Sequence, residues 1–394
     1  MTRAPLQVLV VDDSAVVRQA MLAILTREPG LVVSVAADPL IAQEKMRRMR
    51  PDVIVLDLEM PRMDGFTFLR LLMAQDPIPV VVCASLAERG TEAALRATEE
   101  GAVAVVAKPH SDIRGFIRDS ADMLVDAIRG AAQARVRPRG LAPPAPRAEP
   151  LPRPLAVHRR REDIVALGAS TGGTEALREV LEAMPEDAPG IVIVQHMPPV
   201  FTRTFAERLH RLCRIDVVEA QDGDRVRPGR ALVAPGDRHM SVQRSGAEYV
   251  VELSDGPLVS RHRPSVDVLF SSVARAAGAR GVGALLTGMG SDGARGLLAM
   301  RQAGARTMAQ DEASCVVFGM PREAIALGAA QEVVSLERLG SAILRADYDG
   351  PERARRAASA MGSPTQNAWP TSPTQANGPR RAADKGSTIS LMKK

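Results

Sequence analysis

The chain has 394 residues, of which 45% are apolar, 25% are charged and 3% are aromatic, and its formal charge is +5. This length leaves room for two or three domains with ordinary cores. No apolar stretch approaches the roughly 20 residues that span a bilayer, and no signal peptide is recognisable, so we expect a cytoplasmic protein without membrane insertion. The three cysteines are far apart and lack CxxC spacing, which argues against a disulfide framework or a zinc site.

The excess positive charge lies in two segments. Residues 131–162 and 351–394 each contain eight Arg or Lys against two acids, so each carries +6 and the rest of the chain carries −7. Aromatic side chains on which bases could stack are scarce. The sequence therefore argues against nucleic-acid binding.

Residues 1–130 alternate strand-like apolar runs with segments of helical periodicity. The runs are LQVLVVDD, LVVSVAA, VIVLDL, PVVVCAS and VAVVAK. Five such repeats predict an α/β domain with a five-stranded parallel sheet of the flavodoxin-like type, in the strand order 2-1-3-4-5.

Charged residues stand at the ends of three of these runs. Asp12 and Asp13 end the first, Asp57 ends the third and Lys108 ends the fifth. Because the first and third strands are neighbours in this order, we expect these side chains to converge. Such carboxylates suit Mg²⁺, with Asp57 attacking phosphorus and Lys108 pairing with the transferred group. The alternative is that Asp12 and Asp13 only cap the next helix and Asp57 lies in an ordinary turn.

By these residues the block resembles the receiver domain of bacterial response regulators over residues 5–129. The resemblance implies that Asp57 is phosphorylated. It also implies a switch hydroxyl at the end of the fourth strand and an aromatic residue in the fifth. Ala84 and Val105 occupy those positions here, and Ser85, one residue on, is the candidate switch hydroxyl. We therefore expect an atypical transmission of the phosphorylation signal.

The remainder of the chain divides into three parts. Residues 131–162 are rich in Pro and Arg and predict an extended tether. Residues 163–348 predict a second, doubly wound α/β domain with an antiparallel hairpin in HMSVQRSGAEYVVELSD, where Ser245 and Gly246 suit the turn. Residues 349–394 are rich in Ser, Pro, Gln and Asn and predict a disordered tail.

Three polar residues of the second block each follow an apolar run. Ser170 lies in IVALGASTGG, His196 in IVIVQHMPP and Asp292 in VGALLTGMGSDGA. A nucleophile, a base and an orienting carboxylate can meet where the strands of an α/β sheet end. GASTG also matches G-x-S-x-G, in which small residues permit a sharp strand-to-helix turn. The alternatives are that Ser170 or Thr171 and Asp292 cap the helices that follow them, and that His196 is a structural residue.

A wider set of motifs follows the same order along the chain. GASTGG, QHMPPVFTRTFAERL, APGDRHM, RPSVDVLF, LLTGMGSDGA and FGMPREA stand behind a receiver and linker. Together they resemble chemotaxis protein-glutamate methylesterases, which also deamidate receptor glutamines. The resemblance implies a phosphorylation-regulated serine hydrolase that acts on methyl-accepting chemotaxis receptors, with a chemotaxis histidine kinase as phosphodonor.

The resemblance also implies roles for single residues. Ser170 would attack the ester carbonyl, His196 would accept its proton and Asp292 would orient the imidazole. The backbone N–H of Met289 would be an oxyanion donor, with Thr171 next to the nucleophile. No metal or other cofactor is expected in this domain.

Some interpretations stay open at this point. A non-enzymatic phosphate sink or scaffold of a chemosensory array is the alternative function. His239 can line the site or form a loop turn, and Met197 and Met320 can frame a groove or pack in the core. His262 and Arg263 could contact an acidic receptor surface.

Overall fold

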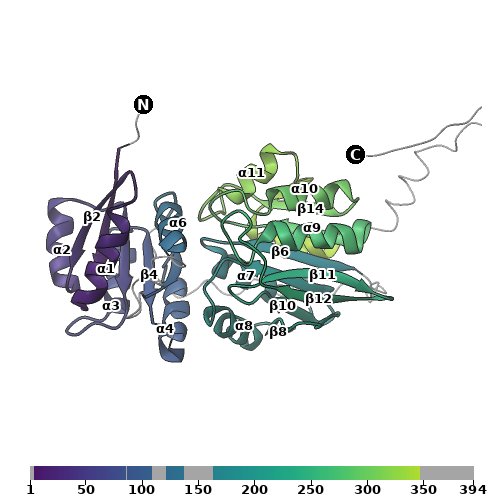
Figure 1. Cartoon of the computed structure of the whole chain (residues 1–394), viewed down its shortest axis with the longest axis horizontal. Coiled ribbons are helices and arrows are strands. Elements are labelled where there is room, and N and C mark those ends of the chain that lie inside the picture. The colour runs from purple at the N-terminus through teal and green to yellow at the C-terminus, as the bar shows by residue number, and fades with distance from the viewer. Residues whose placement is uncertain (1–3, 86, 109–120, 137–162, 347–394) are drawn as a thin grey trace, which may run out of the picture. The chain divides into compact units, whose positions relative to one another are not determined.

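The computed structural model describes residues 4–85, 87–108, 121–136 and 163–346 (Figure 1). Most of the predicted tether, at residues 137–162, and the predicted tail, at residues 349–394, lie outside these ranges. Among the described residues, every helix is too short or too polar to span a bilayer.

The N-terminal domain is a five-stranded parallel sheet in the order β2-β1-β3-β4-β5, which confirms the predicted topology. Its strands are β1 (Leu6–Val11), β2 (Leu31–Ala36), β3 (Val53–Asp57), β4 (Val80–Ala84) and β5 (Ala104–Ala107). Its helices are α1 (Ala15–Leu25), α2 (Pro39–Arg48), α3 (Gly65–Gln75), α4 (Glu88–Glu99) and α6 (Ala121–Ala131).

Local sequence explains why these elements begin and end where they do. Strands β3 and β4 are buried along their whole length and read as continuous apolar runs, as in parallel sheets covered on both faces. The side chains of Ser14, Asp38 and Asp64 accept hydrogen bonds from the first turns of α1, α2 and α3. Because Ser14 is the cap of α1, the alternative that Asp12 or Asp13 caps this helix is wrong.

The second domain is built on a seven-stranded parallel sheet in the order β15-β14-β13-β6-β7-β10-β8. Its strands are β6 (Ile164–Ala169), β7 (Gly190–Gln195), β8 (Asp216–Glu219), β10 (Arg230–Val233), β13 (Gly281–Leu285), β14 (Arg306–Gln310) and β15 (Glu332–Val334). Its helices are α7 (Gly173–Glu182), α8 (Phe201–Leu212), α9 (Val266–Ala277), the short 3-10 helix η1 (Gly278–Arg280), α10 (Ala294–Gln302), α11 (Met320–Ala326) and a last helix over residues 336–346.

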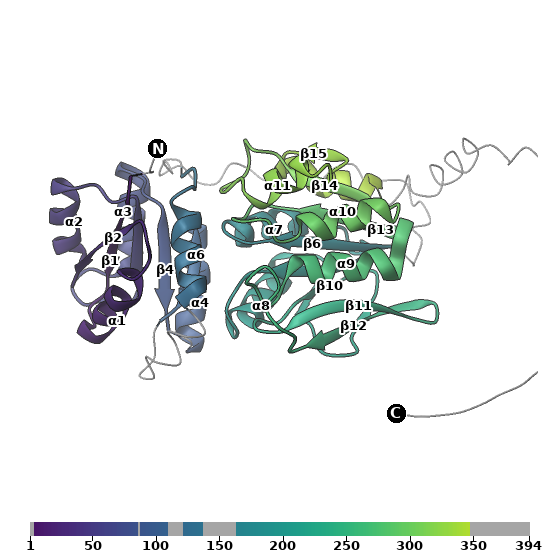
Figure 2. The same ribbon diagram turned by 45° about the horizontal axis from the view of Figure 1, so that its top comes forward.

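Helices cover both faces of this sheet. Along β6, Val165 and Leu167 pack with the apolar side chains of α7 and α8, whereas Ile164 and Ala166 pack with those of α9 and α10. Figure 2 shows α9 and α10 side by side next to β6. Because β6, β7 and β13 are buried throughout, a polar side chain on these strands can reach a substrate only if it lies beyond the strand end.

The predicted antiparallel hairpin is present. It consists of β11 (His239–Ser245) and β12 (Glu248–Ser254), and β9 (Arg225–Val226) adds a third strand. Ser245 pairs with Glu248, so the two-residue loop is 246–247 and the predicted turn was one residue too early. Gly246 takes the first loop position with φ +62°, a conformation that a tight hairpin turn requires and that glycine adopts without strain.

Candidate active site

Strand register places Ser170 beside His196. Ala169 at the end of β6 pairs with Gln195 at the end of β7, so the next residue of each strand leaves the sheet at the same point. The N–H of His196 donates to the carbonyl of Ala169 at 3.2 Å. Strand β13 flanks β6 on its other side and leads into the loop that carries Asp292. Ser170, His196 and Asp292 line one cavity.

The turn between β6 and α7 has no room for larger side chains. Gly172 has φ +77°, and a Cβ on Gly173 would lie 2.1 Å from Oε1 of Gln195. Gly172 is the N-cap of α7, and no side chain caps this helix. The alternative that Ser170 or Thr171 serves as the cap is therefore wrong, and the small residues of GASTGG permit the close approach of β6 and α7 to β7.

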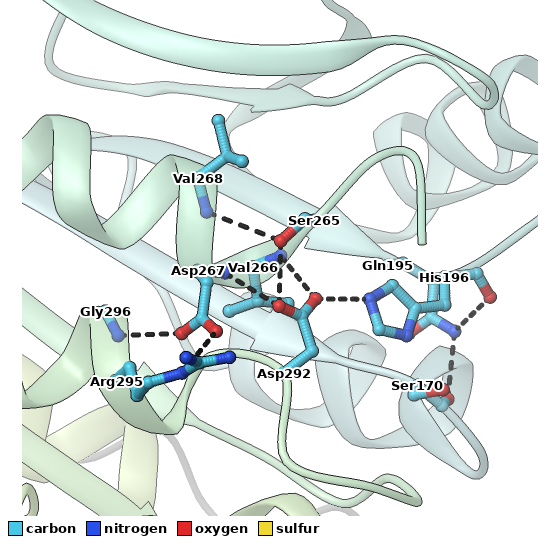
Figure 3. Close-up of polar contacts among 10 residues, drawn as sticks. All are labelled: Ser170, Gln195, His196, Ser265, Val266, Asp267, Val268, Asp292, Arg295 and Gly296. Carbon is cyan, nitrogen blue, oxygen red and sulfur yellow. Dashed lines mark hydrogen bonds and ion pairs between the residues drawn. The ribbon is translucent and has the colours of Figure 1, made fainter. Parts of the chain in front are cut away.

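His196 and Asp292 form a buried pair. Nε2 of His196 lies 2.9 Å from Oδ2 of Asp292, which is 2% exposed. Figure 3 shows the His196 ring between the side chains of Asp292 and Ser170. Because an ionised carboxylate only accepts hydrogen bonds, Nε2 carries a proton, and in the corresponding neutral tautomer the lone pair is on Nδ1. Nδ1 is buried and has no hydrogen-bond partner among the described residues.

The N-terminus of α9 binds the carboxylate of Asp292. The hydroxyl of Ser265 and the N–H of Asp267 donate to Oδ1 at 2.7 and 3.1 Å, and the N–H of Val266 donates to Oδ2 at 2.7 Å (Figure 3). Burial by itself raises the pKa of Asp292, but the hydrogen bond and charge of His196 and these α9 donors outweigh it and lower the pKa to about 2. The alternative that Asp292 caps α10 is wrong, because no side chain caps that helix.

Gln195 joins the two loops that carry Ser170 and His196, and the sequence reasoning did not single it out. Its Nε2 donates to the carbonyl of Ser170 at 2.9 Å and to that of His196 at 3.2 Å (Figure 3). Gln195 is 3% exposed. Gln195 could have been recognised from the sequence as the polar residue that ends the apolar run IVIVQ, because a buried polar side chain requires hydrogen-bond partners.

His262 was also missed as a site residue. Its ring stacks on that of His196, with ring centroids 3.8 Å apart and an interplanar angle of 15°. It is half-buried against the candidate base and lines the same cavity as Ser170, and the suggested contact with a receptor surface stays a prediction.

The other open residues have structural partners. Met197 and Met320 are buried, which agrees with core packing, and Met197 also lines the cavity that contains Ser170. His239 is buried too, and its Nε2 lies 2.9 Å from the carbonyl of Pro257. Arg263 forms an ion pair with Asp237 at 2.6 Å.

Thr171 and Met289, the two residues predicted near the oxyanion, line the same cavity as Ser170. Hydrogen bonds fix the backbone around them. The N–H of Ser170 donates to the carbonyl of Thr287, and the hydroxyl of Thr287 donates to the carbonyl of Thr171, both at 3.0 Å. The roles of Thr171 and Met289 stay predictions.

In the receiver, Asp12, Asp13 and Asp57 meet at the carboxyl edge of the sheet, with ligand oxygens within 4.8 Å of one another. Nζ of Lys108 lies 2.6 Å from Oδ2 of Asp57 and 3.5 Å from Oδ2 of Asp12. Burial raises the pKa of Asp12 to about 6, against the opposing charge of Lys108. Three clustered carboxylates, of which Asp12 and Asp57 are buried, fit a divalent cation with hard oxygen ligands.

The positions that the resemblance assigns to the receiver switch lie in or just after β4 and β5. Ala84 is the last residue of β4, and its carbonyl accepts a hydrogen bond from the N–H of Lys108 at 2.8 Å. Ser85 follows outside the strand and is half-buried, as is Val105 in β5. The role of the Ser85 hydroxyl stays a prediction.

Comparisons with known proteins agree with this architecture. The family model described as CheB methylesterase matches residues 165–343, and the response regulator receiver domain matches residues 8–116. The protein-glutamate methylesterase/protein-glutamine glutaminase 1 of Anaeromyxobacter dehalogenans is 62% identical over 344 residues, which cover 86% of this chain and 98% of that protein. A protein-glutamate methylesterase/protein-glutamine glutaminase of Geobacter metallireducens is 55% identical over 349 residues, with 86% and 98% covered.

Among solved structures, the catalytic domain of the Thermotoga maritima CheB methylesterase is 35% identical, covers 46% of this chain and 97% of its own, and has a TM-score of 0.46. The relatives of high identity span both domains, and they confirm the resemblance that the motifs indicated. With its receiver and its methylesterase domain, the chain belongs to the protein-glutamate methylesterase/protein-glutamine glutaminase family of enzymes.

Proposed function

We propose that this chain hydrolyses glutamate methyl esters and deamidates glutamines on the cytoplasmic helices of chemoreceptors, with Ser170 as nucleophile, His196 as base and Asp292 as its orienting carboxylate. Family membership supports the reaction class. The observation that carries the residue roles is the His196–Asp292 pair next to Ser170, because it leaves Nδ1 of His196 as a buried base without a partner among the described residues.

The proposed reaction has two halves. Oγ of Ser170 bonds to the ester carbonyl carbon and gives its proton to Nδ1 of His196. When the tetrahedral intermediate collapses, the bond to the methoxy oxygen breaks, and that oxygen takes the proton and leaves as methanol. Water then attacks the acyl-enzyme, His196 takes its proton and returns it to Ser170, and the glutamate carboxylate is released. With glutamine, ammonia leaves in place of methanol.

Charge develops at two places during this reaction. The protonated ring of His196 lies against Asp292, whose negative charge the N-terminus of α9 already stabilises, so little reorganisation is needed. The oxyanion would be bound by the backbone N–H of Met289, with Thr171 beside it. Loss of one such donor usually costs about 3 to 4 kcal/mol of transition-state stabilisation.

Methanol release from radiolabelled, methylated receptor membranes tests the proposal directly. The full chain should release methanol in a reaction that depends on Ser170. A phosphate sink or scaffold would bind the same membranes and release none, and that result would replace the enzymatic proposal.

We also propose that a chemotaxis histidine kinase phosphorylates the receiver on Asp57. Asp12, Asp13 and Asp57 would hold Mg²⁺, which when bound neutralises the phosphoryl oxygens. Lys108 would pair with the transferred group, since its ammonium already lies beside Asp57.

Asp57→Asn should abolish labelling by a small phosphodonor, and labelling of the unmodified chain should require Mg²⁺, because the crowded carboxylates otherwise repel the incoming anion. Radiolabelled phosphodonor with and without EDTA measures both effects. Asp76→Asn, at an exposed receiver acid paired with Arg50, is the matched control and should be labelled normally. Labelling that survives in Asp57→Asn would identify another acceptor.

Deletion of residues 1–162 should raise basal methylesterase activity and remove any response to the phosphodonor. Because the sequence predicts a Pro- and Arg-rich tether between the domains, we propose that inhibition by the receiver acts through a reversible contact. Initial rates of the full and truncated chains on the same membranes measure this. A folded truncated chain no faster than the unphosphorylated full chain would refute the inhibition.

The atypical switch leads to a further expectation for the same assay. Because Ala84 and Val105 replace the usual hydroxyl and aromatic residue, phosphorylation should activate the full chain less than deletion does. Equal rates for the phosphorylated and truncated forms would show that the switch is not weakened.

A further inference from the structure

A second imidazole covers one face of the candidate base. The rings of His262 and His196 lie 3.8 Å apart between centroids and are inclined by only 15°, so they are stacked and nearly parallel. A ring covered in this way cannot tilt toward His262, and water cannot reach that face. Neither the Ser170–His196–Asp292 arrangement nor the hydrogen bonds of Asp292 involve the side chain of His262.

The backbone that carries His262 is a tight turn in an unusual conformation. Val259 and His262 exchange two backbone hydrogen bonds, of 2.9 and 3.1 Å. The two residues between them, Ser260 and Arg261, have φ of 52° and 66°. Glycine and asparagine normally occupy such positions, and other residues persist there only where the surrounding structure enforces the conformation. The turn therefore holds His262 at a definite place.

The next residues anchor this turn to the rest of the domain. Nη2 and Nε of Arg263 donate to Oδ1 of Asp237 at 2.6 and 2.9 Å, and Nη1 donates to the carbonyl of Gly256 at 2.9 Å. The hydroxyl of Ser265 then donates to Asp292. The single stretch 259–267 thus contacts the face of His196 through His262 and the carboxylate of Asp292 through the start of α9.

The charge of His262 suits a stacking role. Burial, together with the nearby ring of His196, lowers the pKa of His262 to about 3, although Asp292 acts in the opposite direction. His262 is therefore neutral at ordinary pH. A neutral aromatic face attracts a cation, whereas a second imidazolium would repel it. A protonated His196 can consequently form under His262 without a like-charge penalty.

We propose that His262 is a positioning residue, which stacks on His196 and holds its ring in the orientation that directs Nε2 to Asp292 and leaves Nδ1 open to the nucleophile. The inference rests on the proposed function, because it assigns His196 as the base. It predicts that an aromatic ring is needed at position 262 and that a side chain of similar volume without a π face is insufficient.

Three substitutions at position 262 test this in the full chain: His262→Ala, His262→Leu and His262→Phe. We expect Ala and Leu to lower kcat for methanol release about 10- to 100-fold, as a displaced catalytic group does, with KM changed less than about twofold. Phe should restore kcat to within about threefold of the unmodified chain. His210→Ala, at an exposed histidine of α8, is the matched control and should not change either constant.

A second readout does not depend on the receptor. The rate at which a fluorophosphonate labels Ser170 reports how well the base activates the hydroxyl, and it should rank the unmodified chain and Phe above Leu and Ala. Thermal unfolding confirms that each variant is folded, and the comparison of Phe with Leu remains decisive if Ala is unstable.

Three results would overturn the inference: a normal kcat in His262→Ala, equal rates for Leu and Phe, or a change confined to KM. The first would remove any role in catalysis, the second would reduce the role to filling space, and the third would indicate substrate contact. If the unmodified chain releases no methanol, the proposed function fails, and the order of labelling rates still decides the role of His262.

Discussion

Ser170→Ala is expected to lower methanol release from methylated receptor membranes by at least about a thousandfold, since losing the nucleophile of a triad removes several orders of magnitude of rate. The hydroxyl lies beyond the end of β6, and hydrogen bonds of the Ser170 backbone stabilise the loop around it. The N–H of Ser170 donates to Thr287, and its carbonyl accepts from Gln195 and Gly173. These bonds survive the substitution, so the fold should be retained.

Ser241→Ala is the matched control for this substitution. Ser241 lies in β11, where its hydroxyl makes only long contacts to Glu252, at 3.4 and 3.5 Å, in an exposed setting. Its removal should leave methanol release unchanged. Substantial esterase activity in Ser170→Ala, with an unfolding midpoint like that of the unmodified chain, would show that another group is the nucleophile.

Asp292→Asn is also expected to have a large effect, a loss of about 10⁴-fold in kcat, because the amide no longer fixes the proton on Nε2 of His196. The structure adds a stability cost. Four donors converge on the two carboxylate oxygens, from His196, Ser265, Val266 and Asp267. An amide has one acceptor oxygen, so at least one buried donor would face the NH₂ group, at a cost of about 1 to 3 kcal/mol.

Urea unfolding as a function of pH measures the loss of stability in Asp292→Asn. The pKa of Asp292 is lowered from 3.8 to about 2 in the folded chain, so its ionised form contributes stability above pH 3.8. That contribution is lost as pH falls through about 2, and the stability difference between the unmodified chain and Asp292→Asn should therefore shrink between pH 4 and pH 2. Asp255→Asn, at an exposed acid paired with Arg238, should show no such narrowing. If Asp292→Asn has the same free energy of unfolding as the unmodified chain at neutral pH, the four donors do not stabilise the carboxylate as proposed.

The elements that carry both sites could be predicted from local sequence. Continuous apolar runs such as VIVLD and IVALGA indicate strands buried on both faces, and in parallel sheets only the carboxyl ends of such strands expose polar groups. The convergence of Asp12, Asp57 and Lys108 follows from the strand order. The adjacency of Ser170 and His196 depends on the pairing of β6 with β7, which the structure supplied. The apolar pattern of the chain was thus sufficient to predict which polar residues follow the strand ends.

The sequence by itself thus determined the two α/β domains, the strand ends and the residue types placed there. Only the tertiary structure decided which nitrogen of His196 meets Asp292, that the start of α9 binds that carboxylate, and that His262 covers the ring. These contacts join loops that are distant along the chain, and their geometry depends on turn conformation and helix packing. Both arise from the fold as a whole, because the positive φ of Ser260 and Arg261 is unfavourable locally and is maintained only by the contacts around it.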